Sequence, residues 1–112
     1  MKMTVLRLDQ AMEMRDRVID WTATWDWCVG TVLADRLRAG RFIDGFERLF
    51  LALSQGQPVG CCTLEQRDGV GLAVSPFIAT VYTDPAHRGQ RISHVLCCAA
   101  EDYARSLGFE AV

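Results

Sequence analysis

The chain has 112 residues, of which 50% are hydrophobic and 23% charged, so it suits one small packed domain over residues 1–112 and excludes wholesale disorder. Its formal net charge of -2 argues against a general nucleic-acid binder but leaves room for a local basic patch. No apolar run approaches the roughly 20 residues that span a bilayer, and the first residues lack the apolar stretch of a signal peptide. We therefore expect a cytoplasmic protein that binds neither membrane nor nucleic acid.

The cysteines and histidines predict no metal site. The five cysteines are Cys28 and two adjacent pairs, Cys61-Cys62 and Cys97-Cys98. They form no CxxC motif, and the two histidines are not set four apart on a helix with an acid. Small buried thiols in a reducing compartment are the favoured interpretation. A covalent acyl-cysteine is not favoured, because His87 and His94 flank a turn and no histidine is expected to pair with a cysteine.

Residues 1–47 predict a strand followed by two helices. The short run over residues 4–8 favours the strand, and apolar residues at helical spacing come after it. Asp9 is placed to cap the first helix and Thr31 to cap the second, which Gly40 would end.

After residue 47 the hydrophobic pattern becomes that of a sheet. Two apolar runs within residues 48–66 flank the turn sequence Gln55-Gly56-Gln57-Pro58, so they predict an antiparallel hairpin. A glycine-containing loop over residues 67–75 comes next. Residues 77–83 are apolar on both faces, which predicts a central strand covered on each side.

A long amphipathic helix follows this strand within residues 76–108. Apolar side chains recur at helical spacing from Ile92 to Leu107, and Gly108 ends the helix. Residues 109–112 have the pattern of another strand that is cut short. Such a sheet leaves an open strand edge, so we expect a homodimer in which a second copy covers it.

The turn before the long helix has the sequence Arg88-Gly89-Gln90-Arg91. A helix N-terminus presents unpartnered N–H groups and a partial positive charge, so it suits a phosphate. Gly89 permits close approach of a ligand, and the arginines can add charge-assisted hydrogen bonds. A helix that begins near Gln90 has no capping side chain, whereas Ser93 would cap a later start. The residues alone fit an ordinary turn with solvated arginines equally well.

The segment from Val81 to Leu107 resembles the acetyl-CoA-binding segment of the GNAT superfamily, the Gcn5-related N-acetyltransferases. The family pattern is Arg or Gln, two residues, Gly, one residue, and then Gly or Ala. Arg88 matches the first position and Ser93 is a small residue at the last, whereas Arg91 stands where the family has glycine. The order of the upstream elements also agrees. The resemblance implies a GNAT-like α/β (α+β) fold, with a mixed, mostly antiparallel sheet flanked by helices and truncated after the start of the fifth strand.

The resemblance also implies a function, namely acetyl-CoA-dependent N-acetyl transfer, with no metal, to a primary amine of a small molecule or peptide. Backbone groups of three strand residues would hold the pantetheine arm: Val81, Tyr82 and Thr83. Amides of the turn and helix start would hold the diphosphate: Arg88, Gly89, Gln90, Arg91, Ile92 and Ser93. The alternative is a non-catalytic CoA- or phosphate-binding or oligomeric interaction module derived from a truncated GNAT domain.

No catalytic residue is assigned from the sequence. Glu65, near a strand end, is the carboxylate to test as a base, although a solvated surface acid is the favoured interpretation. Tyr82 and Tyr103 are better explained as packed aromatics. Three tryptophans lie where the family shapes its acceptor pocket: Trp21, Trp25 and Trp27. Packing is favoured for them over an aromatic wall.

Overall fold

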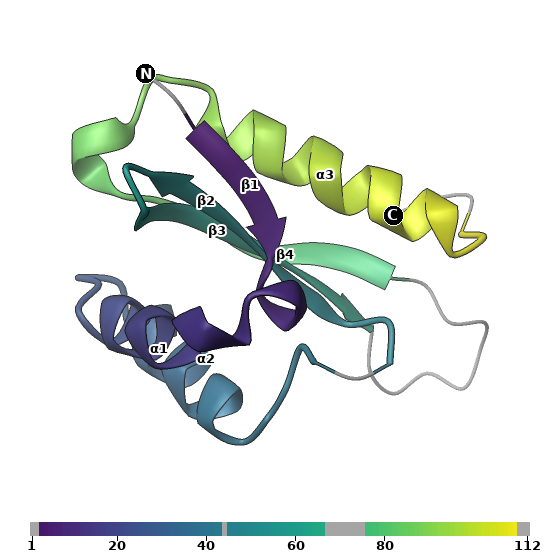
Figure 1. Ribbon diagram of the computed structural model, residues 1–112, viewed down its shortest axis with the longest axis horizontal. Coiled ribbons are helices and arrows are strands. Elements are labelled where there is room, and N and C mark those ends of the chain that lie inside the picture. Colours follow the sequence, from purple (N-terminus) through teal and green to yellow (C-terminus); the bar gives the residue numbers. More distant parts are fainter. Residues whose placement is uncertain (1–2, 44, 67–75, 110–112) are drawn as a thin grey trace.

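The described part of the chain folds as a four-stranded antiparallel sheet between two helical layers (Figure 1). The computed structural model describes residues 3–43, 45–66 and 76–109. Its strands lie in the order β1-β2-β3-β4, and their bounds are β1 Met3–Arg7, β2 Arg48–Ser54, β3 Gln57–Gln66 and β4 Pro76–Thr83. The α-helices are α1 Arg15–Ala23, α2 Val29–Arg38 and α3 Ile92–Ser106. Three short 3-10 helices lie at Leu8–Gln10, Met12–Met14 and Pro85–His87.

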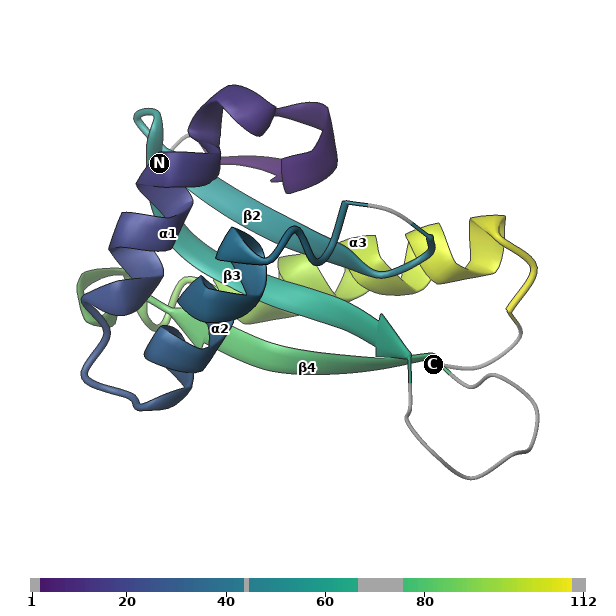
Figure 2. The ribbon, with the colours of Figure 1, turned by 90° about the horizontal axis from the view of Figure 1, so that it is seen from below.

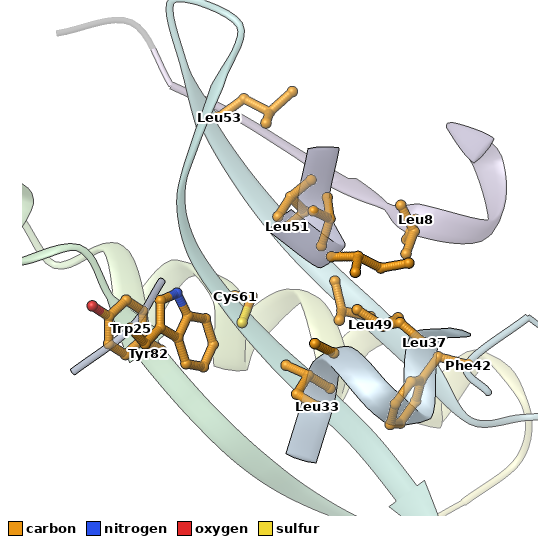
Figure 3. Close-up of a cluster of buried hydrophobic side chains, with 13 residues drawn as sticks. Leu8, Trp25, Leu33, Leu37, Phe42, Leu49, Leu51, Leu53, Cys61 and Tyr82 are labelled. Carbon is orange, nitrogen blue, oxygen red and sulfur yellow. The ribbon is translucent and has the colours of Figure 1, made fainter. Parts of the chain in front are cut away.

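The sheet separates two hydrophobic cores. Helices α1 and α2 cover one face and α3 covers the other, as two perpendicular views show (Figures 1 and 2). Leu49 and Leu51 of β2 belong to the α1–α2 core (Figure 3), whereas Phe50 and Ala52 belong to the α3 core. Alternate side chains of a strand point to opposite faces, so the continuous apolar run of β2 reflects burial on both sides.

The predicted hairpin is confirmed. Strands β2 and β3 pair antiparallel, and Gln55 and Gly56 connect them with φ angles of 53° and 76°. Positive φ at both residues is the requirement of a type I′ turn, whose twist matches that of the flanking strands. Glycine adopts this conformation without a steric penalty, which explains why Gly56 stands there.

Both predicted helix caps are wrong. Helix α1 begins only at Arg15, and Asp9 instead lies in a 3-10 helix, with its carboxylate 3.2 Å from Arg7 Nε and 3.4 Å from Arg48 Nε. The hydroxyl of Thr31 donates to the Cys28 carbonyl (2.9 Å) within the first turn of α2. Asp9 therefore forms ion pairs, and Thr31 bonds to a backbone carbonyl, in place of the expected hydrogen bond to a free N–H at the helix start.

The expectation that β4 is covered on each side is also wrong for the described residues. Residues 77–80 are half-buried and the Val81 side chain is 39% exposed. Within the described part of the chain, β4 pairs with β3 alone. The expected loop over residues 67–75 and the expected strand over residues 109–112 lie outside the described residues, except that the Phe109 ring packs 5.3 Å from that of Phe46.

The cysteines are only partly buried as expected. Cys61 and Cys62 lie on opposite faces of β3 and both are buried, whereas Cys28 and Cys98 are exposed. Burial raises the pKa of the Cys61 thiol well above its usual value and raises that of Cys62 to about 12, so both thiols stay protonated. Among the described helices, none has the length and apolar character that a membrane crossing requires.

Gly30 allows α2 to pass close to α1. A Cβ at Gly30 would overlap the Thr22 carbonyl oxygen and lie 3.0 Å from Trp25 Cβ. We expect Gly30→Ala to lower the free energy of unfolding by about 1–3 kcal/mol, because overpacking of a tight contact shifts the backbone. Urea denaturation measures the change. The control Val32→Ala, at a half-exposed position of α2, should change it by less than about 0.5 kcal/mol; equal effects would contradict the interpretation.

Candidate functional site

A pocket of about 410 Å³ opens where the carboxyl end of β4, the α1–α2 connection and the start of α3 meet. Asp26 and Trp27 line it from the connection, residues 81–83 from the strand, and Arg88 and Ser93 from the α3 side. The structure thus brings together residues from both predicted binding segments. It also adds Asp26, which sequence reasoning missed because nothing local distinguishes it from a solvated acid.

A bulge in β4 shapes the strand side of the pocket. Cys61 of β3 lies opposite Tyr82, but Thr63 lies opposite Ala79, so β4 carries one extra residue between these pairs. Thr80, within the bulge, has a φ of 47°. A bulge bends its strand and redirects the side chains that follow it. Val81, the next residue of β4, accordingly exposes its side chain at the pocket.

The edge of β4 that faces away from β3 carries peptide groups that the sheet does not use. The Asp84 N–H donates to the Val59 carbonyl of β3 at 2.7 Å. Successive peptide groups of a strand point to opposite edges, so the N–H and C=O of Thr83 point away from β3. The Thr83 carbonyl indeed accepts a 3.2 Å hydrogen bond from Arg88 Nε. This orientation leaves the Thr83 N–H directed outward, where an extended ligand can pair with it.

The start of α3 is bare of capping side chains. The helix begins at Ile92, and its N-cap residue Arg91 makes no side-chain cap hydrogen bond. Ser93 is exposed inside the first turn and does not cap the helix, so of the two expected arrangements the structure has the uncapped start, two residues after Gln90. Gly89 has a φ of 85° and no atom lies within 4 Å of where its Cβ would be. The turn therefore offers free amides and open space, which suit an anion.

The start of α3 is held directly on the sheet. Ile92 is buried, and a Cβ on Gly60 of β3 would lie only 2.8 Å from Ile92 Cγ2 and 3.1 Å from the Tyr82 carbonyl oxygen. The absence of a side chain at Gly60 therefore allows the first turn of α3 to approach both β3 and β4. This contact brings the free amides beside the end of β4.

An aromatic cluster forms the other side of the site. The Tyr82 ring stacks on Trp25 with centroids 3.8 Å apart and planes 13° apart (Figure 3). Trp21 packs edge-on at 5.8 Å, and Trp27 lies nearly parallel at 6.4 Å. Trp25 is buried, and its Nε1 has no hydrogen-bond partner among the described residues. Trp27 is 40% exposed and lines the pocket, so the tryptophans divide between packing and a pocket wall.

The phenol of Tyr82 is held in its neutral form. Burial is the largest cause that raises its pKa, and the carboxylates of Asp26 and Asp84 raise it further, against an opposite effect of Arg88. A neutral phenol keeps its O–H as a hydrogen-bond donor at physiological pH. Both acidic side chains therefore lie near enough to act on the tyrosine at the pocket.

Glu65 is not the solvated surface acid that the sequence favoured. It is 5% exposed, accepts a 2.6 Å hydrogen bond from the Thr63 hydroxyl, and lies 3.3 Å from Arg36 and 3.8 Å from Arg41. Its partner in the sheet is Phe77 at the start of β4, whereas the pocket lies at the other end of that strand. The residue therefore joins α2 to the sheet and is remote from the pocket.

Two other predictions about side chains have different outcomes. Tyr103 packs against Phe50 with ring centroids 5.8 Å apart, under the guanidinium of Arg7 at 4.6 Å, as expected for a packed aromatic. The expectation that no histidine pairs with a cysteine is wrong, because His94 Nε2 lies 3.7 Å from Cys98 Sγ on the exposed face of α3. Within the described residues, no group of three or more potential metal ligands comes together.

The backbone at Arg91 explains why the family favours glycine there. Arg91 has φ 60° and ψ 24°, a left-handed conformation that costs an L-residue about 1–2 kcal/mol. Glycine avoids that cost but loses about 0.4–1 kcal/mol more through backbone entropy. We expect Arg91→Gly to raise the free energy of unfolding by up to about 1 kcal/mol, and Arg91→Ala, which keeps a Cβ, to change it by less than about 0.5 kcal/mol. Urea denaturation that ranks alanine above glycine would contradict this account.

The raised pKa of Tyr82 predicts a pH dependence of stability. The neutral phenol is favoured in the folded chain, so this contribution is complete below the unfolded tyrosine pKa of about 10 and is lost as pH rises through the folded value. We expect the free energy of unfolding to fall more steeply above about pH 10 for the parent than for Tyr82→Phe. Cys61 and Cys62 are present in parent and variant alike, so the difference between the two curves reports on the Tyr82 phenol and its neighbours. Parallel curves in denaturant titrations would exclude the effect.

One family model and several solved structures match the chain. The model of the Acetyltransferase (GNAT) family matches residues 11–112. Glucosamine-6-phosphate N-acetyltransferase from Arabidopsis thaliana superposes with a TM-score of 0.66 at 12% identity, covering 100% of this chain and 80% of that one. An aminoglycoside acetyltransferase from an uncultured soil metagenomic sample gives 0.67 at 14%, with coverage of 99% and 77%. A predicted acetyltransferase from Clostridium acetobutylicum, solved with acetyl-CoA, gives 0.59 at 13%, with coverage of 98% and 78%. No curated protein matches the chain.

Proposed function

The chain belongs to the GNAT family of acetyltransferases, and on that premise we propose that it transfers the acetyl group of acetyl-CoA directly to a primary amine of a small molecule or peptide. One observation carries the proposal: α3 begins without a capping side chain beside a pocket at the end of β4. Free N–H groups, the dipole of α3 and the Arg88 guanidinium together suit the diphosphate of CoA.

Each part of the donor has residues of matching chemistry. We assign the diphosphate to the amides of the turn and of the first helical turn, from Arg88 through Ser93. The pantetheine arm carries amide groups, and the outward N–H of Thr83 offers it a strand-like partner. Val81 presents an apolar side chain at the same edge. The open space at Gly89 supports the assignment of the diphosphate to this turn, because no side chain obstructs its approach to the backbone.

The reaction requires an acceptor amine that is neutral when it attacks. Its nitrogen forms a bond to the acetyl carbon while the C–S bond breaks, so the amine loses one proton and the departing sulfur gains one. The attacking amine must therefore be neutral. The rings of Trp27 and Tyr82 supply apolar surface to the pocket, against which the hydrocarbon part of an acceptor can pack.

Location and assembly remain predictions of the same proposal. Free thiols within the described residues, two of them buried in β3, fit a reducing cytoplasm. A homodimer is the predicted assembly.

The diphosphate assignment predicts that a reversed charge at Arg88 weakens the binding of acetyl-CoA. We expect Arg88→Glu to raise the dissociation constant at least about tenfold, since it replaces an attractive charge by a repulsive one. Gly89→Pro should act similarly, because proline cannot adopt the positive φ of that residue. Isothermal titration calorimetry measures both, with circular dichroism as the check of folding. The matched control is Arg105→Glu, an exposed charge reversal in the last turn of the same helix. Folded variants that bind acetyl-CoA like the parent would refute the assignment.

A measurement of turnover distinguishes an acetyltransferase from a non-catalytic CoA-binding module. Thiol release from acetyl-CoA over a panel of primary amines should exceed the rate without amine. Acetyl-CoA binding without amine-dependent release would instead support a non-catalytic CoA-binding module, for which the arginine at position 91 is the specific departure from the family pattern.

A further inference from the structure

The pocket has two chemically different ends. At the α3 end lie Arg88, whose guanidinium is held by the Thr83 carbonyl at 3.2 Å, and the free amides of the helix start. At the other end lie Asp26 and Trp27 of the α1–α2 connection, beside Tyr82. One end therefore attracts anions, and the other offers a carboxylate and aromatic faces, the two groups that bind ammonium ions.

The carboxylate at this end is available for a ligand. Asp26 is exposed, and it makes no ion pair or hydrogen bond with the described residues, whereas the other acid near the pocket, Asp84, lies 3.1 Å from His87. The charge of Asp26 acts on the neighbouring Tyr82, whose pKa it helps to raise. Trp27 is 40% exposed, so a ligand can reach a tryptophan surface beside the acid.

We propose that the acceptor is an aliphatic diamine or polyamine, whose non-reacting ammonium group is held by Asp26 and the exposed indole ring of Trp27. The proposal rests on the proposed acetyl transfer and specifies its acceptor. A carboxylate favours the protonated form of an amine that it pairs with, so an ammonium held there is not a nucleophile. The attacking nitrogen must therefore be a second amino group on the same molecule.

The same geometry disfavours anionic acceptors. Arg88 is the basic side chain among the described residues that line the pocket, and it lies at the end assigned to the diphosphate. A phosphate or carboxylate on the acceptor would then lie near Asp26, where like charges repel. The charge of the group remote from the reacting amine therefore decides selectivity.

Three acceptors of equal length test this selectivity: 1,4-diaminobutane, 4-amino-1-butanol and 4-aminobutanoate. We expect kcat/KM for thiol release to be at least about tenfold higher for the diamine than for the amino alcohol, and lowest for the amino acid. Asp26→Asn should reduce the preference for the diamine toward one and leave acetyl-CoA affinity unchanged. The control Asp20→Asn removes an exposed carboxylate of α1 that does not line the pocket, and should keep the preference.

A binding measurement makes the test independent of turnover. Calorimetric titration of 1,4-diaminobutane into the protein saturated with CoA should give a dissociation constant that Asp26→Asn raises at least about tenfold and Trp27→Leu raises by a smaller factor. Diamine binding that depends on Asp26, in a protein that binds acetyl-CoA but releases no thiol, would support this inference while refuting the proposed transfer. Equal kcat/KM for diamine and amino alcohol, an unchanged preference in Asp26→Asn, or no diamine binding would overturn the inference.

Discussion

The contact on which the site depends is the close approach of α3 to β3 at Gly60. Ile92, the first residue of α3, is buried against this glycine, and any side chain there would meet Ile92 and the backbone of Tyr82. A helix held at its first residue has a defined N-terminus, so the free amides before it face one place in the structure. The position of the turn before α3 is therefore a consequence of core packing.

The opposite side of the pocket depends on aromatic stacking. Tyr82 stacks on Trp25, and Gly30 permits α2 to pass α1 closely enough to hold Trp25 in the core. This arrangement places the exposed Trp27 and its neighbour Asp26 at the end of β4. Because Tyr82 belongs to the strand and the tryptophans to the helical layer, one aromatic stack joins the strand side and the helical side of the pocket.

Two residues with strained backbone lie beside the same pocket. Thr80 in the β4 bulge and Arg91 before α3 both have positive φ, which β-branched and long L-residues adopt at a cost of about 1–2 kcal/mol each. Such conformations persist only where the surrounding packing imposes them, and they occur often at functional sites. The bulge redirects the strand, and the strained turn allows α3 to begin without a cap. Both features expose backbone that a regular strand or a capped helix would cover.

Local patterns in the sequence were sufficient for the hairpin, for the apolar face of α3 and for the absence of a capping side chain at its start, because side-chain periodicity and turn chemistry act over a few neighbouring residues. They were insufficient wherever the partner is distant in the chain. Glu65 is buried because Arg36 approaches from α2, 29 residues away, and Asp9 pairs with Arg48 of β2 instead of capping α1. In the sequence Asp26 has the features of an ordinary surface acid. Only the fold brings it into the same pocket as Tyr82 and Arg88. The sequence alone determined the hairpin and the uncapped start of α3, and only the tertiary structure decided which side chains line the pocket beside it, because their positions follow from packing between elements far apart in the chain.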